Sequence, residues 1–497
     1  MLGLRRVRFV DIGTGLSMMF GTAGMLVAGA LNAAEMQCTP APGYASGVPV
    51  CNDQIFADAA ARLRGLYAGL QGDGGSGPAL PAPACGVGGC SSDGEGSGEE
   101  TPKCWTLVDL FEDDCGNNHL TDNGYNIGGS LAQSYTWNWQ NPSNGWNGPV
   151  TWTDQANQYQ LNQLWMFAEK ATDTSKNDWD IGGRVDLLFG TNARLATSTG
   201  LETPNLNGPG TYGLAIPSLY AEVAYKKLKV KAGHFVSPVG YFTIDTSQNF
   251  FNTIPYTYQW GEPFTHTGVV ATYEFSENFI ASSGYIQGWD NFDGHNPHMG
   301  YLGTWAYTFQ DKSSLSHAVF LTQEPNFNFE FTQRYYQSVV YSKPINEKWT
   351  YVGQTDFGTQ RDATIKGERA NWYGIDQYLY YKVNEKWTWG VNFEWWRDEE
   401  GYRVAQFLPS NLPSGITGNP NGTTNLPGGY QGDFYQLTVG PRWYPKGTPN
   451  LFVRPNLRFD WFDGNINRDV NPAGLAPYDA GTKNNQGLFV TDVVWIF

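Results

Sequence analysis

The sequence predicts an all-β protein, a transmembrane antiparallel up-and-down β-barrel of about 16 strands, with a small disulfide-bearing N-terminal region. Three observations predict it. From Tyr125 onward, apolar residues alternate with polar or small ones. Aromatic residues make up 15% of the chain, which favours half-buried strands. The connections between the alternating segments are short and long in turn, as in a transmembrane barrel with short turns at one rim and long loops at the other.

A repeated turn shows this organisation most directly. Residues 345–351 read INEKWTY, and residues 383–389 read VNEKWTW. Both copies follow an aromatic, alternating run and begin another one. We interpret the distance between them as one hairpin, in which the chain crosses the membrane, turns in a loop and crosses back.

Each expected strand has about the 9–13 residues that a tilted strand needs to cross a bilayer. Their expected positions are 125–138, 158–169, 179–190, 217–226, 228–235, 266–275, 279–289, 299–309, 315–323, 332–343, 348–358, 370–383, 387–397, 433–443, 450–461 and 487–497.

The segments have two distinct faces. In 451–461, Leu451, Leu457 and Trp461 share an apolar face, whereas Arg454 and Asp460 lie on the opposite one. The last segment ends FVTDVVWIF, an amphipathic strand closed by an aromatic residue. Aromatic residues beside the short turns lie where an interfacial girdle is expected; they are Phe275, Phe279, Tyr341, Trp349, Tyr381 and Trp387.

The N-terminal part has a different composition. Residues 1–34 carry early arginines and then a Gly/Ala/Leu/Met-rich run, which is typical of a secretory signal peptide; a membrane anchor is the alternative. Residues 35–101 contain an amphipathic helix at 53–70 and a Gly/Ser-rich acidic linker. Residues 102–123 form a disulfide-bearing segment that leads into the barrel, at 124–497.

All the cysteines precede the barrel. Their even number and the expected export favour disulfides, and sequence neighbours suggest three pairs, although other pairings stay open. The suggested pairs are Cys38 with Cys51, Cys85 with Cys90, and Cys104 with Cys115.

Several functional classes receive no support. The net charge of −16 and the lack of a basic stripe argue against nucleic-acid binding. We find no Ser-His-acid set, nucleophile elbow or phosphate-binding loop, so we expect neither an enzyme nor a cofactor.

The run DGNINRD spaces Asp463, Asn465, Asn467 and Asp469 as in a calcium loop, but Arg468 replaces the expected glycine. We therefore expect no metal, with calcium as a weak alternative; a polar loop is also the default for DNFDGHNPH at 290–298.

Four runs carry a resemblance to a known family. They are GYNIGGSLAQSYTWN (124–138), DIGGRVDLLFGTNAR (180–194), residues 231–275 and SSGYIQGWDNF (282–292). The most specific parts are Gly-His-Phe…Pro-x-Gly-Tyr, Asn-Phe-Phe and Pro-Phe-Thr-His-Thr-Gly, all within 231–275. The chain from Gly124 to Phe497 resembles the OmpL-like family of β-barrel porins. The resemblance implies an outer-membrane diffusion channel without catalytic residues, and porins of this size often form homotrimers.

The long connection 236–265 is aromatic and low in charge, which is unusual for an exposed loop. We expect it to fold into the barrel and narrow the pore, with Asp245 and Glu262 at the constriction; an external loop is the alternative. Alternation also places charged side chains of both signs in the lumen, which favours a weakly selective, slightly cation-preferring channel. These pore-lining candidates are Arg184, Asp186, Glu222, Lys229, Lys231, Glu394, Arg454, Arg458 and Asp460.

We therefore expect an outer-membrane porin for passive diffusion of ions and small hydrophilic solutes, with outer-membrane lipid around it and its N-terminal region in the periplasm. The main alternative is a plugged or structural barrel that anchors the envelope or presents surface loops. A soluble carbohydrate-binding β-protein is a weaker one, suggested by the 19 tryptophans.

Overall fold

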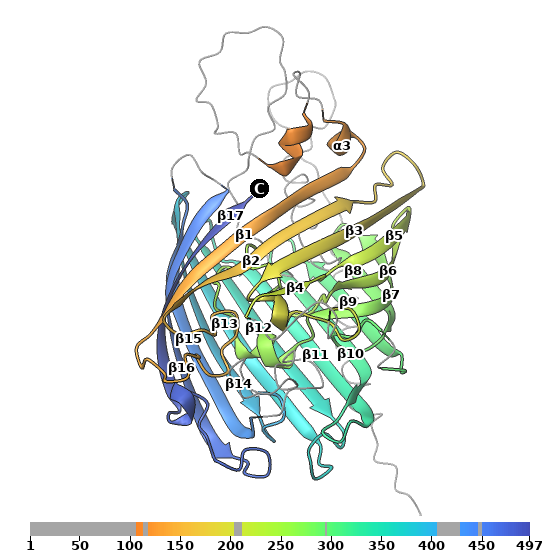
Figure 1. Ribbon diagram of the computed structural model, residues 1–497. Coiled ribbons are helices and arrows are strands. Elements are labelled where there is room, and N and C mark those ends of the chain that lie inside the picture. Colours follow the sequence, from red (N-terminus) through yellow and green to blue (C-terminus); the bar gives the residue numbers. More distant parts are fainter. Residues whose placement is uncertain (1–105, 113–117, 203–210, 294–295, 405–427, 446–449) are drawn as a thin grey trace, which may run out of the picture. The chain divides into compact units, whose positions relative to one another are not determined.

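The computed structural model (Figure 1) describes residues 106–112, 118–202, 211–293, 296–404, 428–445 and 450–497. The expected signal peptide, the 53–70 helix, the linker and all six cysteines lie outside these residues. None of the helices within the described ranges is long and apolar enough to cross a membrane.

The described ranges contain one sheet of 17 strands, of which β4 is a piece of 3 residues beside β3. The 16 strands other than β4 confirm the expected antiparallel β-barrel, and each of them overlaps one expected segment. Their bounds are β1 Tyr125–Asn138, β2 Gln158–Lys170, β3 Trp179–Gly190, β4 Gly213–Ala215, β5 Leu219–Tyr225, β6 Leu228–Val236, β7 Thr265–Ser276, β8 Phe279–Ile286, β9 Gly300–Thr308, β10 Ser314–Pro325, β11 Phe331–Pro344, β12 Trp349–Gln360, β13 Ala370–Asn384, β14 Trp387–Asp398, β15 Tyr430–Trp443, β16 Leu451–Ile466 and β17 Asn485–Ile496.

The helical elements within the described ranges are short. Before the barrel lie η1 Leu107–Phe111 and α3 His119–Asp122, and the connections hold η2 Ala193–Leu195, the π-helical η3 Thr257–Gly261 and η4 Asp479–Gly481.

The sheet closes into a barrel. Each long strand pairs antiparallel with its chain neighbour, and β1 pairs with β17 from Ser130–Ile496 to Asn138–Leu488. The C-terminal residue extends this seam, because the amide of Gly129 donates to the carbonyl oxygen of Phe497 at 2.8 Å and the amide of Phe497 donates back at 2.9 Å. Among the described long strands, each therefore has a partner on both sides, as a barrel in lipid requires.

The two Asn-Glu-Lys turns are built alike. The side-chain oxygen of Asn346 accepts the amides of Lys348 and Trp349 at 2.9 and 3.0 Å. Asn384 accepts those of Lys386 and Trp387 at 2.9 and 3.1 Å. An asparagine that bonds its own backbone two residues on makes a tight turn, so the repeated residues set the short-turn rim.

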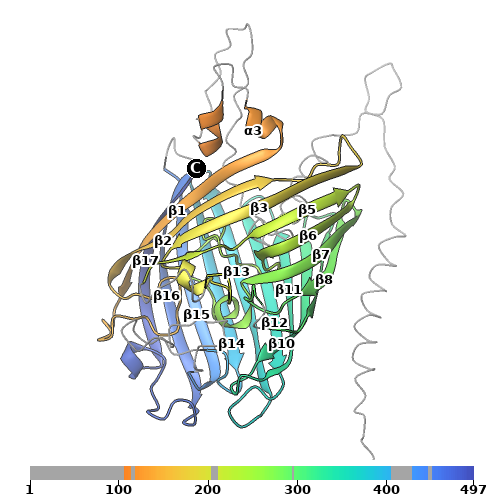
Figure 2. The ribbon, with the colours of Figure 1, turned by 45° about the vertical axis from the view of Figure 1, so that its right-hand side comes forward.

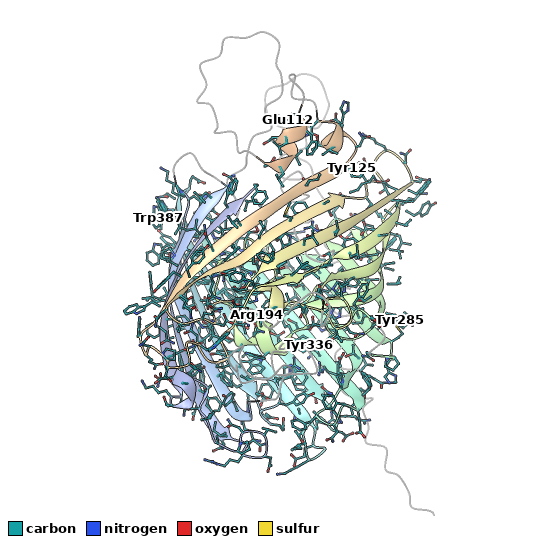
Figure 3. The ribbon with its side chains drawn as sticks, in the orientation of Figure 1. Glu112, Tyr125, Arg194, Tyr285, Tyr336 and Trp387 are labelled. Atoms are coloured by element: carbon teal, nitrogen blue, oxygen red, sulfur yellow. The ribbon has the colours of Figure 1, made fainter. Side chains whose placement is uncertain are left out.

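Alternation separates the two faces of the wall. Along β14, Trp389, Val391 and Phe393 are exposed on the outward face, whereas Asn392 and Glu394 are buried on the inward face. In Figure 3 the side chains of Trp387 and Tyr285 point away from the barrel on opposite sides. At the short-turn rim the rings of Trp349 and Tyr381 lie 4.5 Å apart, as an aromatic girdle would place them.

Candidate functional site

Residues 237–264, which connect β6 to β7 and which we call the inner loop, pack against the inward face of the barrel. Apart from Ser237, Tyr241 and Gln248, the inner loop is buried throughout. Its residues Tyr258, Trp260 and Phe264 belong to the hydrophobic clusters that fill the barrel. The loop is apolar because it is an interior segment, which agrees with the inward position expected from its composition.

The first half of the inner loop is held by β1, β2 and β16. Gln163 of β2 donates to the carbonyl oxygen of Ile244 at 2.6 Å and accepts the amide of Thr246 at 3.0 Å. The guanidinium of Arg454 donates to the carbonyl oxygens of Thr246 and Asn249 at 2.8 and 2.6 Å. These side chains satisfy backbone groups that no strand ladder pairs, which a buried loop needs.

The second half is held by acidic and amide side chains of β12 and β14. Glu394 accepts the amides of Tyr256 and Thr257 at 2.8 and 2.6 Å. Gln354 donates to the carboxylate of Glu262 at 2.5 Å. It also accepts the amide of Tyr241, in the first half of the loop, at 2.8 Å and so contacts both halves. Side chains of the barrel wall therefore supply hydrogen-bond partners to this part of the loop.

The inward charges beneath the inner loop differ along the wall: the arginines lie on one side, where Asp460 and Asp492 pair with two of them, and a group of acids lies on the other. Three inward arginines lie on β15 and β16: Arg442, Arg454 and Arg458. Three inward acids lie on β12 to β14: Asp356, Asp376 and Glu394. Residues 246–254 contact the arginines and residues 256–262 contact the acidic side, so the loop lies across the boundary between the two.

A closed barrel with an apolar outward face and a polar, charged inward face is the arrangement of a membrane channel. Residues 124–497 match the family described as "Putative beta-barrel porin-2, OmpL-like". The chain belongs to this porin family.

The chain is also similar to several solved structures at low sequence identity. The outer membrane channel DcaP of Acinetobacter baumannii is 9% identical, with a TM-score of 0.46 over 75% of this chain and 97% of that one. The anion-selective porin from Comamonas acidovorans is 10% identical, with a TM-score of 0.47 over 75% and 99%. OprB of Pseudomonas putida is 14% identical, with a TM-score of 0.46 over 76% and 95%. None of these likenesses is close enough to carry over a solute or a selectivity, and no curated protein matches the chain.

The porin places its nine predicted pore-lining residues on inward-facing positions, in two groups. Near the short-turn rim, Arg184 of β3 pairs with Asp186 at 2.9 Å, and Lys229 of β6 lies 3.7 Å from Glu222 of β5. The ammonium of Lys231 lies over the ring of Tyr220, 4.4 Å from its centroid. The second group, Glu394, Arg454, Arg458 and Asp460, lies beneath the inner loop. Whether any of them lines the path of a solute stays a prediction.

The two predicted constriction residues lie in different halves of the inner loop. Asp245 accepts the hydroxyl of Ser130 at 3.4 Å and the amide of Ser247 at 2.9 Å. Glu262 is fully buried against Gln354. Burial raises the pKa of Glu262 well above its ordinary value, and the neighbouring Asp356 carboxylate raises it further.

Sequence reasoning missed part of this site. Gln163, Gln354, Asp356 and Asp376 all touch or face the inner loop, and none of them is among the predicted pore-lining residues. The signal was present, because QTD at 354–356 places two polar residues on one face.

The calcium candidate does not form a loop. Asp463 and Asn465 belong to the end of β16, and Asp469 pairs with Lys366 of another loop. Within the described ranges, no group of three or more His, Cys, Asp or Glu side chains could hold a metal ion.

Two serine–histidine pairs lie near the loop ends of β6 and β7. Ser198 lies 3.2 Å from Nε2 of His234, whose Nδ1 faces the hydroxyl of Thr267. Ser237 lies 2.9 Å from Nε2 of His266, whose Nδ1 faces the carbonyl oxygen of Gly288. A catalytic histidine is normally oriented by a carboxylate and open to substrate. Both histidines here are fully buried, and their Nδ1 atoms face a hydroxyl and a carbonyl oxygen, so the pairs differ from that arrangement in both respects.

Proposed function

We propose that this outer-membrane porin lets ions and small hydrophilic solutes diffuse passively through its lumen, which the inner loop narrows. The observation that supports it best is the contrast between the two faces of one closed wall. Outward positions carry Phe393 and Leu457, whereas neighbouring inward positions carry Glu394 and Arg458. A wall that is polar only on its inner side favours water and solutes in the lumen.

The charges on the inward face are of both signs, which supports weak rather than strict ion selectivity. Arginines and acids are present in similar numbers beneath the inner loop, and several are paired with each other, as Arg458 is with Asp460 at 2.8 Å. The net charge of −16 favours cations slightly. Assembly as a homotrimer, common among porins of this size, is part of the same proposal.

A plugged, structural barrel is the second candidate. It is favoured by the burial of inward residues such as Arg454, Arg458 and Glu394, which are at most 1% exposed. In this alternative the inner loop seals the lumen and the protein anchors the envelope or presents its loops.

Planar-bilayer conductance of the detergent-purified mature protein separates the two. Discrete current steps are expected, and the reversal potential in a salt gradient should show a slight preference for cations. Silence from a folded, inserted barrel would favour the plugged alternative, and removal of residues 35–115 would then show whether that region closes the pore.

Deletion of residues 244–258 tests the role of the inner loop. We expect a clear rise in single-channel conductance, because the segment bound to Arg454 and Arg458 would leave the lumen. Deletion of 365–367, in an exposed loop between β12 and β13, is the matched control and should leave conductance unchanged. Equal conductance of both deletions and the parent would contradict narrowing by the inner loop.

A further inference from the structure

A groove lies on the outward face of the barrel, at the loop ends of β8 to β12. Its cavity measures about 540 Å³, and its lining includes Tyr285, Tyr301, Leu321, Gln333 and Arg361. β8, the first of these strands, lies at the right of the barrel in Figure 2, and the side chain of Tyr285 points away from the barrel in Figure 3. We call this cavity the outward groove. Its lining side chains take outward positions by alternation, so the groove faces the membrane and not the lumen.

Apolar side chains of neighbouring strands form the part of the groove toward the membrane centre. Tyr285 of β8 lies opposite Tyr301 of β9, and Tyr301 lies opposite Leu321 of β10. Tyr285 is 65% exposed and Leu321 is 42% exposed. This part of the groove therefore offers uncovered apolar area on the face that lipid contacts.

One tyrosine lies flat and thereby shapes the groove. A Cβ added to Gly303 would lie 2.7 Å from the hydroxyl of Tyr301 and 3.0 Å from its ring, so the ring lies over the glycine. The hydroxyl of Ser283 donates to the hydroxyl of Tyr301 at 3.3 Å. Because the ring points toward the middle of β9, the space between Tyr301 and the loop ends stays open.

The part of the groove nearer the loops is polar. Gln323 of β10 lies opposite Gln333 of β11, and the amide of Arg361 donates to the carbonyl oxygen of Gln333 at 3.0 Å. Asp362 also lines this part, and Arg369 lies close by, since its guanidinium donates to the hydroxyl of Thr359 on the outward face of β12 at 3.3 Å.

The side chains of this polar part are open to a ligand. Within the described ranges, the guanidinium of Arg361 and the side-chain amides of Gln323 and Gln333 have no hydrogen bond or ion pair to another protein group. They therefore present donors beside the apolar part of the groove.

The order of these two parts matches a lipid of the outer leaflet. The long loops of transmembrane barrels lie on the outer side, and tyrosines gather where acyl chains meet headgroups. A guanidinium binds phosphate with two parallel hydrogen bonds. The two amides and the carboxylate of Asp362 suit hydroxyl groups, whereas that carboxylate repels a bare phosphate. A phosphorylated sugar fits this mixture better than a simple phospholipid headgroup.

We propose that the outward groove binds one phosphorylated glycolipid of the outer leaflet. An acyl chain lies along Leu321 and Tyr301, Arg361 binds the phosphate, and Gln333 and Asp362 bind hydroxyl groups of the sugar. This inference concerns the outward face and does not depend on whether the lumen conducts.

Native mass spectrometry of the mature protein, purified in a mild detergent, tests the ligand. Lipid A is the probe, because it carries phosphates on an acylated sugar, and phosphatidylglycerol is the comparison, because it has an acylated phosphate without the sugar. We expect the protein to retain lipid A in preference to phosphatidylglycerol, also in the presence of excess inorganic phosphate. Equal retention of the two lipids, or displacement of lipid A by inorganic phosphate alone, would overturn the proposal.

Arg361→Gln tests the phosphate contact. Loss of the charge-assisted hydrogen bonds should lower the retained lipid A by about tenfold or more. Lys366→Gln is the matched control, because Lys366 is exposed in the same connection, pairs with Asp469 at 2.6 Å and does not line the groove. It should retain lipid A as the parent does. Equal retention of lipid A by the two variants would contradict binding through Arg361.

Gly303→Ala tests the shape of the groove without a change of charge. The added Cβ should push the ring of Tyr301 off the wall and toward the groove, and so lower the retained lipid A. Gly353→Ala is the matched control, because a Cβ there would lie equally close, at 2.7 Å, to the hydroxyl of Tyr351, in the half of β12 nearer the short turn.

The heat-dependent shift of the barrel on a denaturing gel reports that each variant is folded. A folded Gly303→Ala variant that retains as much lipid A as Gly353→Ala would contradict binding in the groove. Lipid A that binds the monomer but is excluded from an assembled oligomer would show that a second copy covers the groove, and would also overturn the proposal.

Discussion

Arg454 on β16 donates a hydrogen bond of 2.8 Å from its guanidinium to the carbonyl oxygen of Thr246 in the inner loop. The same guanidinium binds the carbonyl oxygen of Asn249 and pairs with Asp492 on β17. One buried cation therefore joins two strands of the wall to a loop that lies 208 positions earlier in the chain. These hydrogen bonds hold the first half of the inner loop against the barrel wall.

Arg454→Ala should destabilise the barrel and loosen the inner loop. The substitution leaves Asp492 buried without its cation, which costs about 3–5 kcal/mol in the free energy of unfolding. Arg397→Ala is the matched control, because Arg397 pairs with Asp433 on the outward, partly exposed side and should cost about 1 kcal/mol or less. Denaturant unfolding in detergent measures both, and equal losses would contradict the role of Arg454. In the bilayer, the Arg454→Ala channel should show larger and noisier current steps.

Gly240→Ala should displace Glu262 from its place in the inner loop. Gly240 has a φ of +76°, and an added Cβ would lie 2.3 Å from one carboxylate oxygen of Glu262 and 2.4 Å from the other. Gly367 is a close control, with a φ of +73° and open space around its missing Cβ. Both alanines carry a backbone strain of about 1–2 kcal/mol. Only Gly240→Ala should lower the free energy of unfolding by more than this strain and change the single-channel conductance. Identical stability and conductance of the two variants would contradict the close approach of Gly240 to Glu262.

Asp290→Asn should remove a dependence of stability on pH. Burial raises the pKa of Asp290 from 3.8 to about 7 in the folded protein. The folded state then holds a proton that the unfolded state releases, so the stability from this group is fully present below pH 3.8 and is lost as the pH rises through about 7. One carboxylate oxygen of Asp290 accepts the amides of Phe264 and Thr265 and the hydroxyl of Thr265. An asparagine can keep all three bonds through its carbonyl oxygen.

Unfolding midpoints of the parent and of Asp290→Asn at pH 5 and pH 8 check this sign. Between pH 5 and pH 8 the parent should lose more stability than the variant, because only the parent has the Asp290 carboxyl. Burial also raises the pKa of Glu202 to about 7, but Glu202 is present in both proteins, so its contribution cancels in the comparison. A parent that gains stability over the same interval, relative to the variant, would contradict a raised pKa.

Leu457→Arg should hinder the barrel in lipid. Leu457 faces outward near the middle of β16, where an arginine in the apolar band costs about 2–4 kcal/mol. Ile345→Arg places the same residue in a short turn beyond the strands and should cost about 1 kcal/mol or less. Folding yields into lipid vesicles compare them. A low yield for Ile345→Arg alone would mean that the outward face of β16 does not contact lipid.

The sequence by itself determined the strands, their faces and their turns. Alternation is a local property, since residues i and i+2 share a face whatever the rest of the chain does, and it placed Leu457 on the apolar face and Arg454 on the opposite one before any pairing was known. The turns were equally local, because Asn346 and Asn384 bond amides two and three residues away. The apolar composition of 236–265 also indicated an inward loop, although it could not name what holds it.

Only the tertiary structure decided which residues meet inside the barrel. Glu394 and Thr257 are 137 positions apart, and their contact depends on closure of the sheet and on the register of every strand between them. His234 of β6 likewise meets Ser198 and Phe292, which come from two separate connections. Such contacts have no local pattern in the sequence, because they are formed by groups that only the closed barrel brings together.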